Sequence, residues 1–269
     1  MVNVIKLEGV NWERDQKRII QNIQWEVKSG EHWAILGANG SGKTSLLKLI
    51  TGYEWATNGK ITVFGEQFGQ TSILEIRKRI GWLSASLEER HRHYNGLTCV
   101  DIIASGRHAS IGIHEELSDH DVERAYMLAD QMGLSKVKEA QLGTLSQGER
   151  KKTFYARALM AAPEMVIVDE PTSGLDLLAR EQFLNQLHTH HQKERSPTLL
   201  YVTHYPEEIV PAVTHVLLLK NGEALAAGPK KEVLTNDYLS EAFDVPIHVA
   251  WRDERPWIQI SSLENIGSK

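Results

Sequence analysis

Residues 37–44 have the composition and spacing of a loop that binds phosphate groups. They match the pattern G-x-x-x-x-G-K-[ST], reading Gly37-Ala38-Asn39-Gly40-Ser41-Gly42-Lys43-Thr44. Glycines let the backbone curl until its N–H groups face phosphate oxygens, and a helix that begins there adds unsatisfied N–H groups. Lys43 supplies an ammonium for the outer phosphates, and the Thr44 hydroxyl supplies an oxygen for Mg²⁺. A strand-like segment precedes the loop and a helix-like segment follows it, which favours phosphate binding over an ordinary glycine turn.

Two adjacent carboxylates, Asp169 and Glu170, follow the apolar segment 165–168. Four apolar residues predict a buried strand, so the carboxylates are expected at its carboxyl end. Taken alone, such a pair is typical of a solvated strand end. With the phosphate loop upstream, Asp169 becomes the expected Mg²⁺ partner, through water, and Glu170 is expected to polarise an attacking water. Phosphoryl transfer needs this kind of positioning and charge neutralisation more than covalent chemistry.

Strand and helix patterns alternate along most of the chain. Strands are expected at 2–8, 22–28, 32–36, 60–64, 164–169, 198–204, 214–219 and 223–227, and helices after residue 42 and at 98–106, 119–132 and 176–194. This order predicts an α/β fold with a mostly parallel sheet and an active site at the strands' carboxyl ends, plus an antiparallel β subdomain. Strand signals vanish at about 85–145, which predicts an inserted helical subdomain. Residues 1–228 would then form the main domain and 229–269 a C-terminal appendix.

The bulk composition excludes several classes of protein. The net charge of -5 and the pI of about 6.2 do not indicate direct nucleic-acid binding. The single cysteine, Cys99, lies in an apolar stretch and is expected to fill the core, without an intrachain disulfide. No apolar run approaches the ~18 residues that span a bilayer. We therefore expect a cytoplasmic protein that reaches the inner face of a membrane only through another chain.

A second helix start with anion-binding character occurs at residues 145–149, which read LSQGE. Ser146 is a good candidate for the helix N-cap, and a helix start of this kind attracts anions. Since the chain has one phosphate loop, a second anion site needs another purpose. Here the sequence resembles the ABC ATPase family, whose signature is LSGGQ. The resemblance covers residues 1 to about 225 and includes several motifs in the family's order.

The resemblance implies a P-loop NTPase core that binds ATP with Mg²⁺ and hydrolyses it. It also implies a homodimer in which two chains sandwich two ATP molecules head to tail, with Ser146 and Gly148 on the γ-phosphate held by the other chain. Residues 173–176 resemble the loop that crosses the dimer interface, His204 the histidine that contacts the γ-phosphate, and Trp12 the aromatic that stacks on adenine. An ordinary packed tryptophan is the alternative for Trp12.

The residues assigned on these grounds fall into three groups. Catalytic roles go to Lys43, Glu170 and His204, and metal binding to Thr44 and Asp169. The residues expected to contact ATP are Trp12, Gly37, Asn39, Gly40, Ser41, Gly42, Lys43, Thr44, Ser45, Ser146, Gln147, Gly148 and Asp176.

One position departs from the family's pattern. A glutamine normally ends the segment that here reads IGWLSA, and Ala85 takes its place. An alanine methyl group neither donates nor accepts a hydrogen bond, so Ser84 or Ser86 would have to substitute. This departure weakens the expectation of conventional coupling to a transporter.

Three functions remain open. The chain could drive a separate membrane permease, because 97–106 and the appendix resemble importer subunits for metal chelates. It could act without transport, as the missing glutamine favours, because 104–106 and 110–112 are similar to a molybdenum-associated ATP-binding protein. The third possible function is a non-catalytic nucleotide-gated clamp. The presence of Glu170 and His204, both expected to be catalytic, disfavours it. The clustered His188, His190 and His191 are expected on a solvated helix face.

Overall fold

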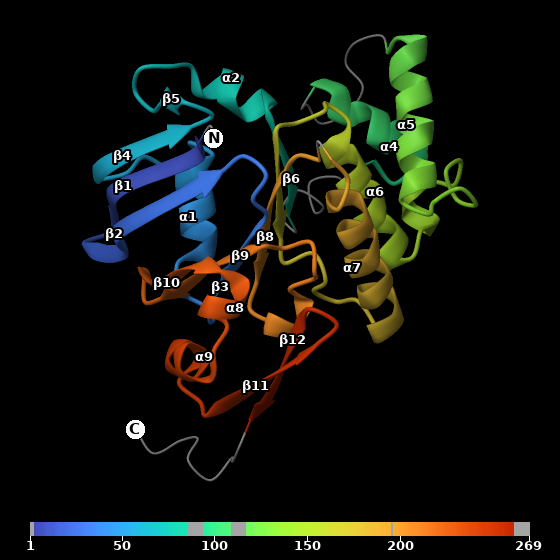
Figure 1. Cartoon of the computed structure of the whole chain (residues 1–269). Helices are drawn as coiled ribbons and strands as arrows, with labels where there is room; N and C mark the ends of the chain where they lie inside the picture. Colours follow the sequence, from blue (N-terminus) through green and yellow to red (C-terminus); the bar gives the residue numbers. More distant parts are fainter. Residues whose placement is uncertain (1–2, 85–93, 109–116, 195, 261–269) are drawn as a thin grey trace. The chain divides into compact units, whose positions relative to one another are not determined.

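The computed structural model describes residues 3–84, 94–108, 117–194 and 196–260, and the chain divides into two compact units. The first unit joins the two ends of the chain, residues 1–76 and 198–269, and the second is the intervening segment 77–197 (Figure 1). None of the helices that these ranges contain is long and apolar enough to cross a membrane.

The first unit contains an antiparallel four-stranded sheet, four strands of a mostly parallel sheet, a helix after the phosphate loop, and short helices and a two-stranded sheet near the C-terminus. Its elements are β1 (Asn3–Arg14), β2 (Lys17–Lys28), β3 (Trp33–Leu36), α1 (Lys43–Ile50), β4 (Asn58–Val63), β5 (Glu66–Gln67), β8 (Thr198–Thr203), η4 (Pro206–Glu208), β9 (His215–Lys220), β10 (Glu223–Pro229), α8 (Lys230–Val233), α9 (Asn236–Phe243), β11 (Ile247–Arg252) and β12 (Arg255–Ile260). Helix α2 (Ile73–Lys78) includes the boundary between the units.

The antiparallel sheet has the strand order β2, β1, β4, β5, which confirms the predicted antiparallel subdomain. Strands β1 and β2 are longer than predicted, because their pairing continues past the buried Val10, Trp12 and Ile20 to exposed charged residues at the end of the hairpin. Asp15 and Gln16 make the turn with φ angles of 52° and 62°. Trp12 lies directly opposite Ile20, so both side chains point to the same face of the sheet.

The parallel part of the first unit places β3 between β8 and β9, with β10 antiparallel at the edge beside β9. Every residue of β3 and β8 is buried, as expected for strands covered on both faces. Leu36, the last residue of β3, is in register with Thr203, the last residue of β8. The segments that follow these two strands therefore leave the sheet at the same edge, which is where the α/β fold predicts a ligand.

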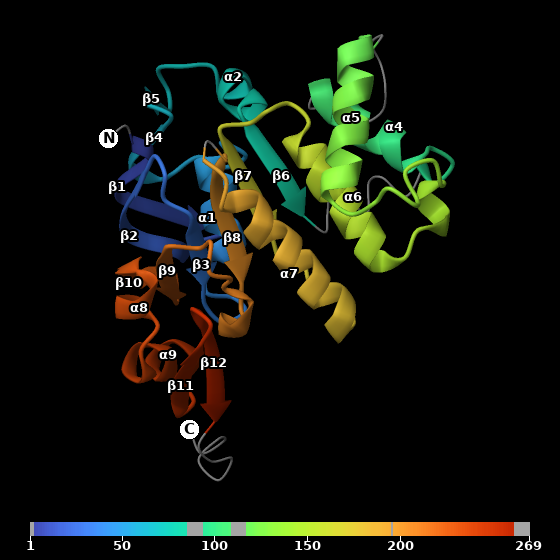
Figure 2. The same cartoon turned by 45° about the vertical axis from the view of Figure 1, so that its right-hand side comes forward.

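The second unit combines a parallel strand pair with helices. Its elements are β6 (Ile80–Ser84), α4 (Cys99–Ala104), η2 (Ser105–His108), α5 (Asp119–Gln131), η3 (Leu142–Thr144), α6 (Gln147–Leu159), β7 (Met165–Asp169) and α7 (Leu177–His191). Cys99 is fully buried, as predicted. Helices α6 and α7 lie side by side in both views (Figure 2). Gly81 and Gly106 allow backbone to approach α6 closely, since a Cβ on either would lie within 2.2 Å of a carbonyl oxygen of Arg157 or Ala158.

Candidate active site

The phosphate loop joins β3 to α1 through a tightly packed turn. Gly40 and Gly42 have φ angles of 81° and 104°, which favour glycine because other residues are strained there. A Cβ on Gly37 would lie 2.4 Å from the carbonyl oxygen of Leu219, so this position also excludes larger residues. The structure thus explains three of the predicted site glycines by backbone geometry and close packing.

The turn between β9 and β10 braces this loop from far along the chain. The N–H of Gly222 donates to the carbonyl of Ser41 at 3.0 Å, and the N–H of Gln21 donates to the carbonyl of Gly222 at 2.9 Å. A Cβ on Gly222 would lie 2.3 Å from the carbonyl oxygen of Ile19. The sequence predicts strands at 214–219 and 223–227 on either side of this turn, but it offers no local signal for the turn's contact with the phosphate loop.

The polar groups of the loop are arranged to receive an anion. Lys43 is 5% exposed, and its ammonium donates to the carbonyl oxygens of Gly37 at 2.9 Å and Ala38 at 3.1 Å. Ser41 Oγ is buried and hydrogen-bonds to no group in the described ranges. Gly42 precedes α1 and has no side chain with which to cap it, so no side chain competes with a ligand for the first turn of the helix. These features fit phosphate oxygens.

His204 and Trp12 extend the same site within the first unit. His204 follows Thr203, so the register of β3 and β8 places it beside the start of the phosphate loop. Trp12 shares a sheet face with Ile20, whose side chain would meet a Cβ on Gly42 at 2.9 Å. Trp12 is 7% exposed, so both faces of its indole are largely covered by the chain itself. Adenine could stack on the indole only if one face became uncovered. The packed alternative for Trp12 describes this conformation.

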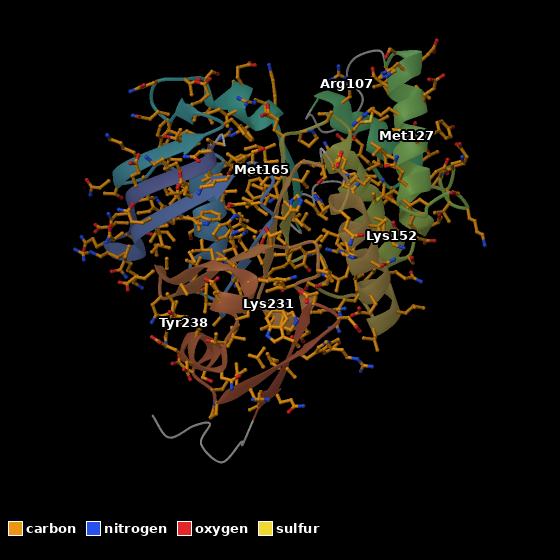
Figure 3. All side chains as sticks on the ribbon, in the orientation of Figure 1. Arg107, Met127, Lys152, Met165, Lys231 and Tyr238 are labelled. Atoms are coloured by element: carbon orange, nitrogen blue, oxygen red, sulfur yellow. The ribbon has the colours of Figure 1, made fainter. Side chains whose placement is uncertain are left out.

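Asp169 is the last residue of strand β7 in the second unit and Glu170 follows it, so both carboxylates lie at the carboxyl end of the strand, as predicted (Figure 3 labels Met165 at its start). Glu170 has a φ angle of 47°, a left-handed conformation that costs a residue other than glycine about 1 kcal/mol. Strained backbone of this kind is concentrated at functional sites. Ser84 pairs with Asp169 in the parallel register of β6 and β7. A residue with a hydroxyl group therefore lies beside the carboxylates. Ala85 and Ser86 lie outside the described residues.

The second unit also brings the signature segment and residues 173–176 together. Ser146 caps α6, as the sequence predicts. The structure adds a capping box with Glu149: Ser146 Oγ donates to Glu149 Oε2 at 2.7 Å, and the N–H of Glu149 donates to Ser146 Oγ at 3.3 Å. A Cβ on Gly148 would lie 3.1 Å from Ala179 Cβ, so a glycine permits this approach of α6 and α7.

Asp176 caps the neighbouring helix and completes this surface. Its Oδ1 accepts a hydrogen bond from the N–H of Ala179 at 2.8 Å, at the start of α7. A Cβ on Gly174 would lie 3.3 Å from the Oε1 atom of Gln147. Ser146, Gln147 and Asp176 are all exposed. The predicted site residues therefore form one group around the phosphate loop in the first unit and another around α6, α7 and β7 in the second.

The chain is similar to known ATP-binding proteins of ABC transporters. The ABC transporter family model matches residues 20–173. The ABC transporter ATP-binding protein YlmA of Bacillus subtilis is 41% identical over 95% of this chain and 96% of its own. ModF of Escherichia coli, another ABC transporter ATP-binding protein, is 36% identical over 76% of this chain and 41% of its own.

Solved structures share the fold. A chain of a metal-chelate type ABC transporter in an inward-facing conformation superposes with a TM-score of 0.77 over 98% of both chains, at 24% identity. A dimeric ATP-binding cassette bound to ADP and Pi has a TM-score of 0.69 and is 22% identical, covering 84% of this chain and 98% of its own.

The phosphate loop and the parallel sheet define a P-loop nucleotide-binding protein of the α/β class. The chain belongs to the ABC transporter family, as its ATP-binding subunit type, which binds and hydrolyses ATP. The predicted family, fold class and ATPase activity are thereby confirmed.

Proposed function

We propose that two copies of this chain bind two ATP molecules head to tail, and that hydrolysis lets the copies separate. The observation that carries the proposal is the grouping of Ser146, Gln147 and Asp176 on exposed helix starts of the second unit. The chain already has a phosphate loop, so this second group is suited to an ATP molecule held by a partner copy.

In this proposal the phosphate loop holds the chain's own ATP. Backbone N–H groups from Gly37 to Ser45 and the Lys43 ammonium bind the phosphates, since charged hydrogen bonds are the strongest kind available there. Lys43 would exchange its two loop carbonyls for phosphate oxygens, which are better partners for an ammonium. Trp12 contacts adenine if its indole becomes uncovered.

Thr44 Oγ1 and the Asp169 carboxylate are the proposed ligands of Mg²⁺, with Asp169 acting through water. Thr44 is exposed at the start of α1, and both residues offer the hard oxygen atoms that Mg²⁺ prefers. When bound, the metal would neutralise charge on the β- and γ-phosphates.

Glu170 is the proposed general base and His204 the proposed γ-phosphate contact. Glu170 stands directly after Asp169 at a strained backbone position, of the kind that is concentrated at functional sites. Accepting a proton from the attacking water contributes typically 10²–10⁴-fold in rate. His204 is half-buried beside the loop and orients the water and the phosphate.

A complementation experiment tests the head-to-tail arrangement. Lys43→Ala removes a chain's own ATP site, and Ser146→Arg blocks the site that the chain offers to its partner. Each variant alone should be inactive, while Ser146→Arg should still bind ATP as a monomer. Mixing the two should restore a fraction of the wild-type turnover, because one of the two sites in each mixed dimer is intact. An inactive mixture, with ATP binding lost in Ser146→Arg, would show that Ser146 serves its own chain's ATP.

The partner remains the second question. The names of the relatives favour a membrane permease, whereas Ala85 removes the glutamine through which such a partner would act. We propose slow hydrolysis that does not depend on a membrane protein. Ala85→Gln should raise turnover or Mg²⁺ affinity modestly, unless Ser84 or Ser86 already fills the role, in which case alanine at that serine should be costly. Stoichiometric copurification with an integral membrane protein would refute the independent ATPase.

A further inference from the structure

The loop that carries His204 is anchored by a buried carboxylate. Glu208 is 1% exposed, and its Oε2 accepts hydrogen bonds from Tyr201 Oη at 3.0 Å and from Thr203 Oγ1 at 2.6 Å. Thr203 Oγ1 also accepts a hydrogen bond from the N–H of Tyr205 at 3.0 Å. The residues immediately before and after His204 are therefore bonded through a single hydroxyl, and the Glu208 carboxylate holds that hydroxyl in place.

The C-terminal appendix is bonded to the same loop. Arg255, the first residue of β12, donates from Nε to the carbonyl oxygen of Glu207, which adjoins Glu208 in η4. Lys230 Nζ donates to the carbonyl oxygen of Pro211 at 3.2 Å and to that of Glu254 at 3.1 Å. Lys230 is 7% exposed, and burial lowers its pKa. The appendix thus contacts the segment after His204 at two points, Glu207 and Pro211.

The hairpin of β11 and β12 is itself held firmly. Lys231, labelled in Figure 3, pairs with Glu254 at 2.8 Å at the hairpin turn. Ser240 Oγ and Asn236 Oδ1, both in α9, accept the outward N–H groups of Ile247 and Val249 at 2.8 Å each. A hairpin fixed at its turn and along its outer edge can impose a position on η4 through Arg255.

We propose that Glu208 and Arg255 are positioning residues for His204, and that the appendix thereby sets the rate of ATP hydrolysis. The inference rests on the proposed contact between His204 and the γ-phosphate. Neither residue touches ATP in this scheme: Arg255 holds η4, η4 carries Glu208, and Glu208 holds the hydroxyl of Thr203. A displacement of about 1 Å in a group that positions reacting atoms can lower a rate by up to about 10²-fold.

Single substitutions separate positioning from binding. Arg255→Ala and Glu208→Ala should each lower kcat about tenfold or more, since His204 loses its fixed position. The Kd for ATP, measured by titration of the full-length protein, should change by less than about threefold, because the phosphate loop is untouched. Glu208→Gln keeps an acceptor oxygen and Arg255→Lys keeps a donor, so both should recover most of the turnover. Arg252→Ala is the matched control: it removes an arginine from the same hairpin whose side chain is 84% exposed.

The decisive measurement repeats the substitutions in a His204→Ala background. If Arg255 and Glu208 act through His204, neither substitution should lower kcat further there, because residues that act as a unit are not additive. Losses that multiply in the His204→Ala background would overturn the positioning role and leave the role of His204 intact. Wild-type turnover in His204→Ala itself would overturn both. Should Glu208→Ala fail to fold, Arg255→Ala and its double variant still decide.

Discussion

Two helices, α1 and α6, begin at predicted anion sites, and the two helix starts differ in how they are capped. Helix α1 follows Gly42, which has a left-handed conformation and no side chain that could cap the first turn. Helix α6 follows Ser146, and a capping box between Ser146 and Glu149 satisfies the N–H groups of these two residues. The start of α1 therefore has no side-chain cap, whereas the start of α6 is capped by the side chains of Ser146 and Glu149.

In the proposed dimer, this difference means that the two sites would bind ATP by different exchanges of hydrogen bonds. At α1, phosphate would accept hydrogen bonds from backbone N–H groups and from the Lys43 ammonium, which would exchange two loop carbonyl oxygens for phosphate oxygens. Phosphate at α6 must draw the Ser146 hydroxyl away from Glu149 and approach a carboxylate. We therefore expect tight binding at the first site and weaker, ATP-dependent association at the second.

The largest effect should come from Glu170→Gln, which should leave ATP bound and uncleaved between the start of α1 in one chain and the start of α6 in its partner. The amide keeps the size and loses the base, so kcat should fall by about 10²–10⁴-fold while ATP affinity is retained. The variant should accumulate as an ATP-bound dimer in size exclusion with light scattering. Glu164→Gln, just before the same strand, is the control and should behave as wild type. A purely monomeric Glu170→Gln protein in saturating ATP would contradict the sandwich.

Lys43→Ala should weaken ATP binding at the first start by about 100-fold or more, because each hydrogen bond to a charged group contributes about 1.5–3 kcal/mol. Titration with ATP and Mg²⁺ measures the loss. Lys48→Ala, in the last turn of the same helix, removes an equal charge away from the loop and should leave affinity unchanged. An undiminished affinity in Lys43→Ala would disprove the role of the phosphate loop.

Ser146→Ala should separate the cap from the proposed ligand contact at the second start. Losing the cap should lower the free energy of unfolding by about 1 kcal/mol, seen as a fall in Tm of a few degrees. Hydrolysis should fall as well, through weaker dimerisation in ATP. Ser118→Ala removes a capping box of the same type from α5 and should reproduce the loss of Tm alone. Equal turnover in the two variants would confine Ser146 to a structural role.

The smallest effect is expected for Glu149→Gln, which keeps an acceptor for Ser146 and removes the negative charge. The dimer should form at a few-fold lower protein concentration in ATP, and this gain should shrink in high salt as charges are screened. Sedimentation at two ionic strengths gives the comparison. Asp121→Asn changes the corresponding carboxylate of α5 and should not alter dimerisation. A weaker Glu149→Gln dimer would mean that the carboxylate supports the site.

Much of the fold follows from local patterns. The apolar run at 165–168 predicted β7, and the N-cap preference of serine predicted the start of α6 at Ser146. The prediction failed where burial depends on distant segments. The expectation of a solvated face is wrong for His191, which is 3% exposed and hydrogen-bonds through Nε2 to Tyr155 Oη at 2.7 Å. Burial also lowers the pKa of His190 to about 4.

The sequence by itself determined the phosphate loop, the strand-end carboxylates and the signature helix start, because each depends on residues within one turn or one strand. Only the tertiary structure decided which of them share a unit, that Gly222 braces the loop, and that Glu208 and Arg255 reach the segment of His204. The physical reason is the separation along the sequence between the residues that interact. Glycine geometry and helix capping act over a few residues, whereas a hydrogen bond between residues 48 positions apart, as between Arg255 and Glu207, exists only after packing brings their strands and turns together.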